Sequence, residues 1–425
     1  MSALANKGFK QTEIGVIPED WHCSKISEVC VTSSGTTPAR SQFDRYFRNG
    51  QINWVKTLDL NNSEILKTDE QVTIEALAET SLKLYPVKTV LVAMYGGFNQ
   101  IGRTGILRVP ACVNQAITAI QCENQLSPEY LLATLNFRVE HWKAVASSSR
   151  KDPNITSQDV RDFQIAYPSR DEQEKIAETL SCIDSLIRSL DQLIAKKRDI
   201  QQATMQQLLT GQRRLPGFSG EWEEKRLGDH LSFLKNGTNS RAELSTEGDV
   251  HYLHYGDIHG SQHLLLNPAK SSMPCLPRDK AKRLDRLENG DVIFADASED
   301  LDGVGKSVEV QLPEGMELVS GLHTIAVRFD KKVISDGFKA YLQFIPTFRS
   351  HLRQLAAGTK VYATSRAHIA SAEVEIPEIE EQTAIASILS EMDTELAALE
   401  TRRDKARQIK QGMMQELLTG RIRLV

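Results

Sequence analysis

The chain has 425 residues, of which 40% are hydrophobic and 25% are charged, and its formal net charge is −5. This length exceeds what one hydrophobic core usually supports, so two or more domains are expected. The composition excludes a disordered, collagen-like or disulfide-scaffold protein, and the acidic balance argues mildly against a strongly basic, stand-alone nucleic-acid binder.

No part of the chain has the pattern of a membrane helix or of a secretory signal. No apolar run approaches the roughly 18 residues that a membrane helix needs, and the opening MSALANKGFKQTEIG has no apolar core. The six cysteines show no CxxC spacing. We therefore expect a cytoplasmic protein with free thiols, at Cys23, Cys30, Cys112, Cys122, Cys182 and Cys275.

An internal repeat organises the chain. Residues 171–215 and 380–424, which lie 209 positions apart, are identical at 20 of their 45 aligned positions. Both copies contain the motif LLTG, at 208–211 and 417–420. The preceding halves match more weakly, for example at Trp21 and Trp222. The sequence is therefore a duplication in which a variable domain and a repeated helix alternate.

The variable segments, roughly 17–168 and 216–376, predict α+β domains with β-rich cores. Short β-type runs are separated by loops rich in Gly, Asn, Ser and Asp. Strands are expected at 52–58, 87–93, 116–120, 292–294 and 324–327, and helices at 128–144 and 336–355. The expected domains are 1–168, 169–215, 216–376 and 377–425.

Each repeated segment predicts one long helix, about 38 residues and thus about 57 Å in length. Apolar residues recur in alternating steps of three and four, which is typical of a heptad seam, and a glycine follows each segment. We expect an antiparallel coiled-coil spacer with an internal pseudo-two-fold repeat; a plain helical hairpin core is the alternative. The residues expected to form the spacer and to dock partners are Ile176, Leu180, Ile183, Ile187, Leu190, Ile194, Ile385, Leu389, Met392, Leu396 and Leu399.

The duplicated pattern resembles the specificity subunits of Type I restriction-modification systems. The similarity lies in FKQTEIGVIPEDW (9–21), SSGTTP (33–38), NWVKTLDL (53–60), the helices entered by DEQ or EEQ, and the exit QQLLTGQRRLPGF (206–218). It covers essentially the whole chain.

The resemblance implies two target-recognition domains, each reading one half of a bipartite site in double-stranded DNA. It implies a non-catalytic subunit whose helices dock two methyltransferase subunits, which in turn bring a motor/nuclease subunit. S-adenosylmethionine, ATP and Mg would then bind to those partners and not to this chain. The recognised base sequence cannot be inferred from the resemblance.

The residues themselves give no positive sign of catalysis. Asp152-Pro153-Asn154-Ile155 lacks the second proline and the aromatic of an amino-methyltransferase motif, and a turn is the default interpretation. Gly305-Lys306-Ser307 resembles the end of a P-loop, but Asp300 occupies the position of its first glycine. A zinc site at His251, His254, His259, His263 and Cys275 is not expected, because Asn53 and Lys56 replace the first two in the other repeat.

Candidate DNA-binding residues are basic and amide side chains on loops, because phosphates and base edges are contacted by such groups. The solvated surface charge remains the ordinary alternative for each one. The candidates are Arg40, Arg45, Arg48, Asn99, Gln100, Arg103, Arg150 and Lys151 in the first half, and Lys235, Asn239, Arg241, Lys306, Lys360, Tyr362 and Arg366 in the second.

The charge balance of the repeated segments indicates whether the helices bind DNA or protein. Segment 171–215 has seven acidic and seven basic residues, and segment 380–424 has eight and seven. A helix that follows phosphates would be more basic, so the helices are expected to meet protein partners. Two other functions remain open: a coiled-coil adaptor whose outer domains bind protein, and a self-sufficient DNA methyltransferase.

Overall fold

The computed structural model describes residues 8–97, 99–146, 154–261, 263–356, 358 and 361–425. Contacts divide the chain into two compact units. Unit 1 contains residues 1–190 and 402–425, and unit 2 contains residues 191–401. Each unit therefore combines one variable domain with the beginning of one long helix and the end of the other.

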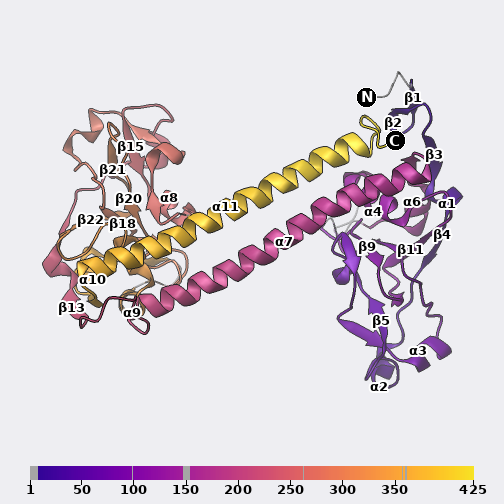
Figure 1. Cartoon of the computed structure of the whole chain (residues 1–425), viewed down its shortest axis with the longest axis horizontal. Coiled ribbons are helices and arrows are strands. Elements are labelled where there is room, and N and C mark those ends of the chain that lie inside the picture. Colours follow the sequence, from indigo (N-terminus) through magenta and orange to yellow (C-terminus); the bar gives the residue numbers. More distant parts are fainter. Residues whose placement is uncertain (1–7, 98, 147–153, 262, 357, 359–360) are drawn as a thin grey trace. The chain divides into compact units, whose positions relative to one another are not determined.

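A mixed five-stranded sheet forms the centre of unit 1 (Figure 1). Only β6 and β9 run parallel; the other neighbours are antiparallel. All four residues of the central strand β8 are buried, because both faces of this sheet are covered. In spatial order the strands are β4 (Cys30–Ser34), β11 (Ile117–Cys122), β8 (Val90–Ala93), β9 (Thr104–Leu107) and β6 (Ser63–Ile65).

A smaller sheet of unit 1 has the order β10 (Ala111–Val113), β5 (Ile52–Val55) and β7 (Glu70–Val72). Figure 1 shows β5 with α2 (Phe43–Tyr46) and α3 (Ile74–Glu79) at the end of unit 1 that lies away from the long helix α7. The remaining elements of this domain are β1 (Phe9–Thr12), β2 (Gly15–Pro18), β3 (His22–Lys25), α1 (Ile26–Val29), α4 (Pro128–Phe137), α5 (Glu140–Val145), α6 (Ser157–Asp162) and β12 (Gln164–Tyr167).

Unit 2 repeats this topology. Its five-stranded sheet has the order β14 (Leu231–Phe233), β22 (Thr324–Phe329), β18 (Val292–Ala295), β20 (Ser307–Val310) and β16 (Leu265–Leu266), again with only the last pair parallel. Its three-stranded sheet is β17 (Cys275–Leu276), β15 (Val250–Leu253) and β21 (Leu318–Ser320). The other elements are β13 (Glu223–Arg226), α8 (Tyr255–Gly260), β19 (Ala297–Ser298), α9 (Pro346–Leu355), β23 (Tyr362–Ala363), α10 (Arg366–Ala370) and β24 (Glu373–Ile376).

Four predicted elements are shorter than expected or interrupted. The strand predicted at 87–93 begins only at Val90. The strand predicted at 52–58 ends at Val55, because the Asp59 carboxylate accepts from the Lys56 backbone N–H (2.7 Å) and closes a 3₁₀ turn. The helix predicted at 336–355 is interrupted at Ile345, since the residue before Pro346 is disfavoured in helical geometry. The helix predicted at 128–144 is two helices, separated at residues 138–139.

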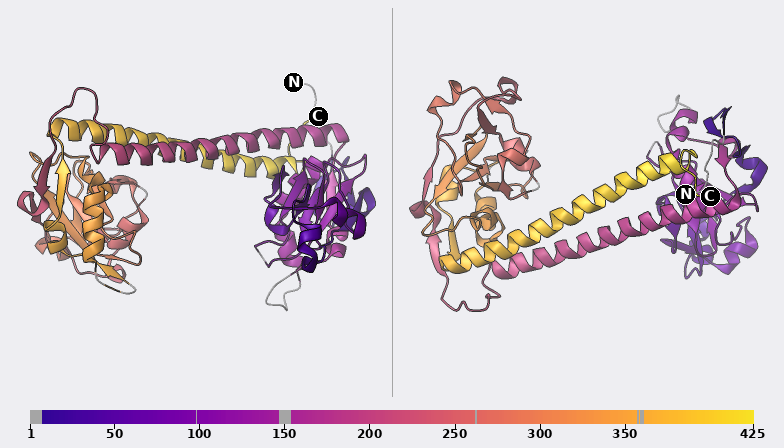
Figure 2. Two further views of the ribbon diagram at one scale, coloured as in Figure 1. Left: turned by 90° about the horizontal axis from the view of Figure 1, so that it is seen from below. Right: turned by 45° about the horizontal axis from the view of Figure 1, so that its top comes forward.

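The two long helices predicted from the repeat are confirmed. α7 (Arg170–Leu208) and α11 (Ile379–Leu417) have 39 residues each, so each is about 58 Å long. The left view of Figure 2 shows the strands of unit 1, in indigo and violet, on one side of α7.

Within each unit the helix segments run antiparallel. In unit 1, Lys410 contacts Asp184 (2.6 Å). In unit 2, Lys197 contacts Glu395 (2.7 Å) and Gln201 donates to Asp393 (2.6 Å). In unit 2, later residues of α7 therefore meet earlier residues of α11.

The seam residues pack inside the units. Seven of the eleven are buried and four are half-buried, the four being Ile183, Ile187, Met392 and Leu399. In unit 1 the domain core includes Ile176 and Leu180 together with Leu417 and Leu418. The corresponding core of unit 2 includes Ile385, Leu389, Leu208 and Leu209. Each domain thus buries leucines from the LLTG motif of the other repeat.

One glutamine anchors the beginning of each long helix to its domain. The Gln173 amide donates to the carbonyls of Gln125 (2.9 Å) and Pro168 (3.0 Å) and accepts from Ser127 N (2.7 Å). Gln382 makes the same three kinds of hydrogen bond in unit 2. The DEQ and EEQ motifs therefore include a buried side chain with all its hydrogen-bonding groups occupied.

Candidate nucleic-acid interface

In unit 1, loops from distant parts of the chain meet beyond the end of β8. Met94 N donates to Ala116 O (2.8 Å), and Ile155 N donates to Met94 O (3.0 Å). Asn114 N donates to Val55 O (3.0 Å), which brings the end of β5 to the same place. These backbone bonds define what is termed the loop end of unit 1, residues 34–40, 56–59, 94–97, 99–103, 114–116 and 154–157.

Unit 2 uses the same backbone frame. Asp296 N donates to His323 O (3.1 Å), Thr364 N donates to Asp296 O (2.7 Å), and Gly321 N donates to Leu253 O (2.8 Å). Thr364 lies 209 positions after its counterpart Ile155. The loop end of unit 2 comprises residues 234–241, 254–261, 296–306, 321–323 and 361–366.

All the described candidates of the second half lie at the loop end of unit 2. The Arg366 guanidinium donates to Leu234 O (3.0 Å) and to the side chain of Asn236 (3.2 Å). Lys306 Nζ donates to His259 O (2.6 Å), and burial lowers the pKa of Lys306. The others there are Lys235, Asn239, Arg241 and Tyr362, of which Arg241 pairs with Asp257 (2.8 Å).

The first-half candidates fall into two groups. Arg40, Asn99, Gln100 and Arg103 lie at the loop end of unit 1, where Arg40 pairs with Glu70 (2.6 Å) and Arg103 Nε donates to Asn99 O (2.9 Å). Arg45 and Arg48 lie outside it, on and just after α2, and pair with Glu79 (2.8 Å) and Asp44 (2.9 Å). Arg150, Lys151 and Lys360 lie outside the described residues.

These contacts change how the basic residues are interpreted. Arg40 and Arg241 are paired with carboxylates, and Arg103, Lys306 and Arg366 donate to neighbouring backbone carbonyls. A guanidinium with five donors can keep such a bond and still donate to a phosphate. The loop ends are therefore polar surfaces on which these basic side chains are held in place by neighbouring groups; in the part of the chain that the structure describes, they are not patches of unpaired positive charge.

A cluster of rings lies at the loop end of unit 2. Tyr255 is surrounded by His254, His259 and His323, with ring centroids 4.6, 6.1 and 5.4 Å away. His323 Nδ1 also lies 3.2 Å from an Asp296 carboxylate oxygen. Sequence reasoning noted His254 and His259 but missed Tyr255 and His323, because His323 lies far from them in the sequence.

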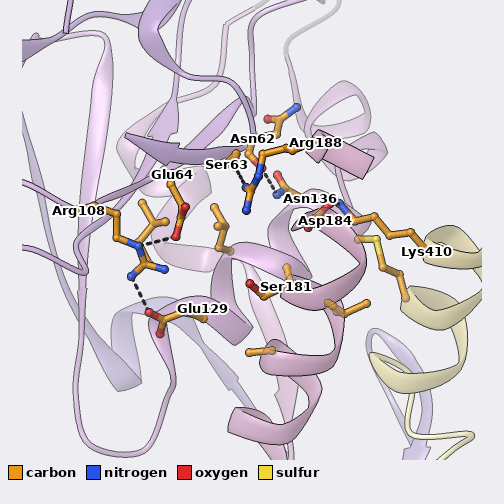
Figure 3. Close-up of a pocket in the computed structure, with 16 residues that line it drawn as sticks. Asn62, Ser63, Glu64, Arg108, Glu129, Asn136, Ser181, Asp184, Arg188 and Lys410 are labelled. Carbon is orange, nitrogen blue, oxygen red and sulfur yellow. Dashed lines mark hydrogen bonds and ion pairs between the residues drawn. The ribbon is translucent and has the colours of Figure 1, made fainter. Parts of the chain in front are cut away.

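A cavity of about 80 Å³ in unit 1 is lined by β6, β9, α4 and the two long helices (Figure 3). Arg108 bridges Glu64 and Glu129, both at 2.8 Å. Lys410 pairs with Asp184 on another wall (2.6 Å). Because these charged groups are paired with one another in the cavity walls, we interpret the cavity as a gap in the packing and not as a ligand site.

Metal-ligating clusters and membrane-length apolar helices are both absent from the described part of the chain. Among those residues, no group of three or more His, Cys, Asp or Glu side chains is arranged to hold a metal ion. No helix there is long and apolar enough to cross a membrane. Of the five residues first considered for zinc, His254 instead caps α8 by accepting from Gly256 N (3.2 Å), and His259 Nε2 donates to Ala297 O (2.8 Å).

Comparisons with known proteins agree with this architecture. Residues 18–196 match the model of the Type I restriction modification DNA specificity domain. The Type I restriction enzyme MjaIX specificity subunit of Methanocaldococcus jannaschii is 28% identical over 249 residues, which are 55% of this chain and 56% of that subunit. The chain thus spans little more than half the length of this relative.

A putative MjaX specificity subunit of the same organism is 21% identical and aligns over 98% of this chain and 97% of its own length. The crystal structure of the Type I restriction-modification S subunit from M. genitalium superposes with a TM-score of 0.62 at 15% identity, over 93% of this chain and 96% of that one. Residues 18–196 are thus similar to the Type I restriction modification DNA specificity domain, and the fold of the chain is similar to that of the M. genitalium S subunit.

Proposed function

We propose that this chain reads a bipartite site in double-stranded DNA, with one loop end for each half-site. The observation that supports this most directly is the shared backbone frame: the same hydrogen bonds position the loops in both units, while the side chains on them differ. Loops on a rigid sheet can change their side chains without loss of the scaffold. Two loop ends with the same backbone arrangement and different side chains could therefore recognise two different base sequences.

The chain is proposed to act without chemistry of its own. S-adenosylmethionine would bind to methyltransferase subunits, and ATP and Mg to a motor/nuclease subunit joined through them. The paired cations at the loop ends and the net charge of −5 support shared binding, since phosphate neutralisation supplies most of the affinity for DNA.

Methylome sequencing of a host that expresses the chain with its methyltransferase tests this proposal. We expect one motif with two specified parts and an unspecified gap. Arg103→Ala should weaken base preference in one part, and Lys306→Ala should weaken it in the other, because the two residues belong to different units. A continuous motif, or a variant that alters both parts equally, would contradict the proposal.

Methyltransferase docking is proposed to involve two equivalent isoleucines. Ile200 in unit 2 and Ile409 in unit 1 lie 209 positions apart, and both are exposed, by 43% and 46%. The buried seam residues cannot offer such a contact. One exposed isoleucine at the same place in each repeat suits two copies of the same partner subunit, and the near-neutral helices around them favour protein over DNA.

Ile200→Asp is expected to remove one methyltransferase subunit from the complex, and Ile409→Asp the other, because a charge at the centre of an apolar contact costs its desolvation. Native mass spectrometry would count the subunits. Gln202→Asp and Gln411→Asp, at two exposed and mutually equivalent positions, are the matched controls. Retention of two methyltransferase subunits by the double isoleucine variant would exclude this docking surface.

Two other functions predict different results. A self-sufficient methyltransferase would bind S-adenosylmethionine as the isolated chain, which calorimetry would detect. A protein-binding adaptor would give no gel shift with DNA even when its methyltransferase partner is present.

A further inference from the structure

The two loop ends differ most clearly at one pair of positions. The backbone bond between Asp296 N and His323 O in unit 2 corresponds to the bond between Met94 N and Ala116 O in unit 1. Asp296 O also accepts from Thr364 N, as Met94 O accepts from Ile155 N, so Asp296 and Met94 occupy equivalent positions. On the same scaffold, unit 2 therefore has an acid and an imidazole where unit 1 has a thioether and a methyl group.

His323 is held in an unusual backbone conformation. Its φ is +57°, a region that few residues other than glycine adopt, although histidine and asparagine tolerate it better than most. Such strained loop residues cluster at functional sites. The His323 side chain is 51% exposed, so the ring is available to a ligand.

The contact with Asp296 determines what this ring can offer. An ionised carboxylate only accepts hydrogen bonds, so His323 Nδ1, 3.2 Å from Asp296 Oδ1, carries the proton of the neutral ring. Nε2 is then an acceptor.

The ring is also fixed by its neighbours. Tyr255 lies edge-on to it, with ring centroids 5.4 Å apart. The groups that bear on its charge are Asp296, Tyr255 and His254. Burial lowers the pKa of His254; Asp257 opposes this effect, and Arg241 adds to it.

We propose that the Asp296–His323 pair is a specificity-determining element of the second half-site, in which Nε2 of His323 accepts a hydrogen bond from the exocyclic amino group of an adenine or a cytosine. Both amino groups face the major groove, where they distinguish these bases from thymine and guanine. The inference rests on the proposed reading of DNA by the loop end of unit 2. It adds to that function the residue pair and the kind of base edge that it recognises.

The test uses the complete chain assembled with its methyltransferase subunits. Binding is measured on a duplex that carries the motif found by methylome sequencing and on duplexes that change one of its base pairs at a time. We expect the wild-type complex to bind one A- or C-containing position of the second half-site at least tenfold better than its substitutes.

His323→Gly should abolish the preference at that position, because glycine has no side-chain acceptor and tolerates positive φ. Asp296→Asn is the second variant, and it should weaken the preference by releasing the ring. His22→Asn, at an exposed strand residue outside the loop end of unit 1, should leave every preference unchanged.

Unaltered preferences of His323→Gly at every position of the second half-site would overturn the inference while the DNA-reading function stands. If the wild-type complex binds no bipartite duplex, the proposed function itself fails.

Discussion

Arg423→Ala is expected to destabilise unit 1 by about 3–5 kcal/mol, which is the usual cost of leaving one partner of a buried ion pair alone. The Arg423 guanidinium forms two bonds to the Glu172 carboxylate (2.7 and 2.6 Å) and two to Asp20 (2.8 and 3.0 Å). These bonds raise the pKa of Arg423. Glu172 is only 1% exposed, so water cannot replace the lost guanidinium.

The duplication supplies a second copy of this arrangement. Arg214 forms two bonds to Glu381, at 2.7 and 2.5 Å, and Glu381 is buried. Both arginines lie over a tryptophan, Trp21 for Arg423 and Trp222 for Arg214. Arg214→Ala should therefore weaken unit 2 in the same direction and spare unit 1.

Hydrogen exchange of the complete chain, read by mass spectrometry, separates the two units. In Arg423→Ala the amides of β3, β12 and the first turns of α7 should lose protection, while the strands of unit 2 keep theirs. Arg421→Ala is the control, because its contact with Glu416 (3.5 Å) joins two more exposed side chains and should contribute little. Equal protection in the two variants would show that the buried pair does not stabilise the unit.

The long helices were predictable because their signals are local. A heptad seam depends only on residues close in sequence, and the identity of 20 in 45 positions is found by comparing the sequence with itself. Proline likewise marks a break that is visible in the sequence, at Pro346, although the expected helix at 336–355 ran through it. The pairing of Arg423 with Glu172 was not predictable, since 251 positions separate the two residues.

The candidate site shows the same limit. Arg45 and Arg241 look alike in a sequence, yet one lies on α2 and the other at the loop end of unit 2. Their carboxylate partners, Glu79 and Asp257, cannot be identified before the strands are paired. The equivalence of Ala116 with His323 appears only in backbone hydrogen bonds between distant segments. The composition indicates loops with polar side chains, but it does not show which of these loops are joined by backbone hydrogen bonds.

Glu309→Gln is expected to remove a pH dependence from the stability of unit 2. Glu309 lies on β20, is 2% exposed, and accepts from Gly337 N (2.6 Å) and Ala340 N (2.9 Å). Burial raises its pKa from 4.5 to about 7, against the opposing effect of those N–H groups and of Lys339. In unit 1 the equivalent position, opposite the first residue of the central strand, is Ile106.

The sign follows from proton linkage. Because the folded pKa exceeds the unfolded one, the folded unit binds more protons between pH 4.5 and 7, and its stability falls as the pH rises through this range. Between pH 5 and 7.5 the loss from this group amounts to about 2 kcal/mol. The glutamine stays neutral, so its variant should show a correspondingly flatter curve, whatever its absolute stability.

Exchange rates of β18 and β22 amides, corrected for the intrinsic effect of pH, measure this slope in the complete chain. Unit 1 is the internal control, since Ile106 cannot titrate and its strands should show the same curve in both proteins. Parallel curves for unit 2 in the wild type and in Glu309→Gln would mean that the carboxylate remains ionised at pH 5, stabilised by the two N–H groups that face it.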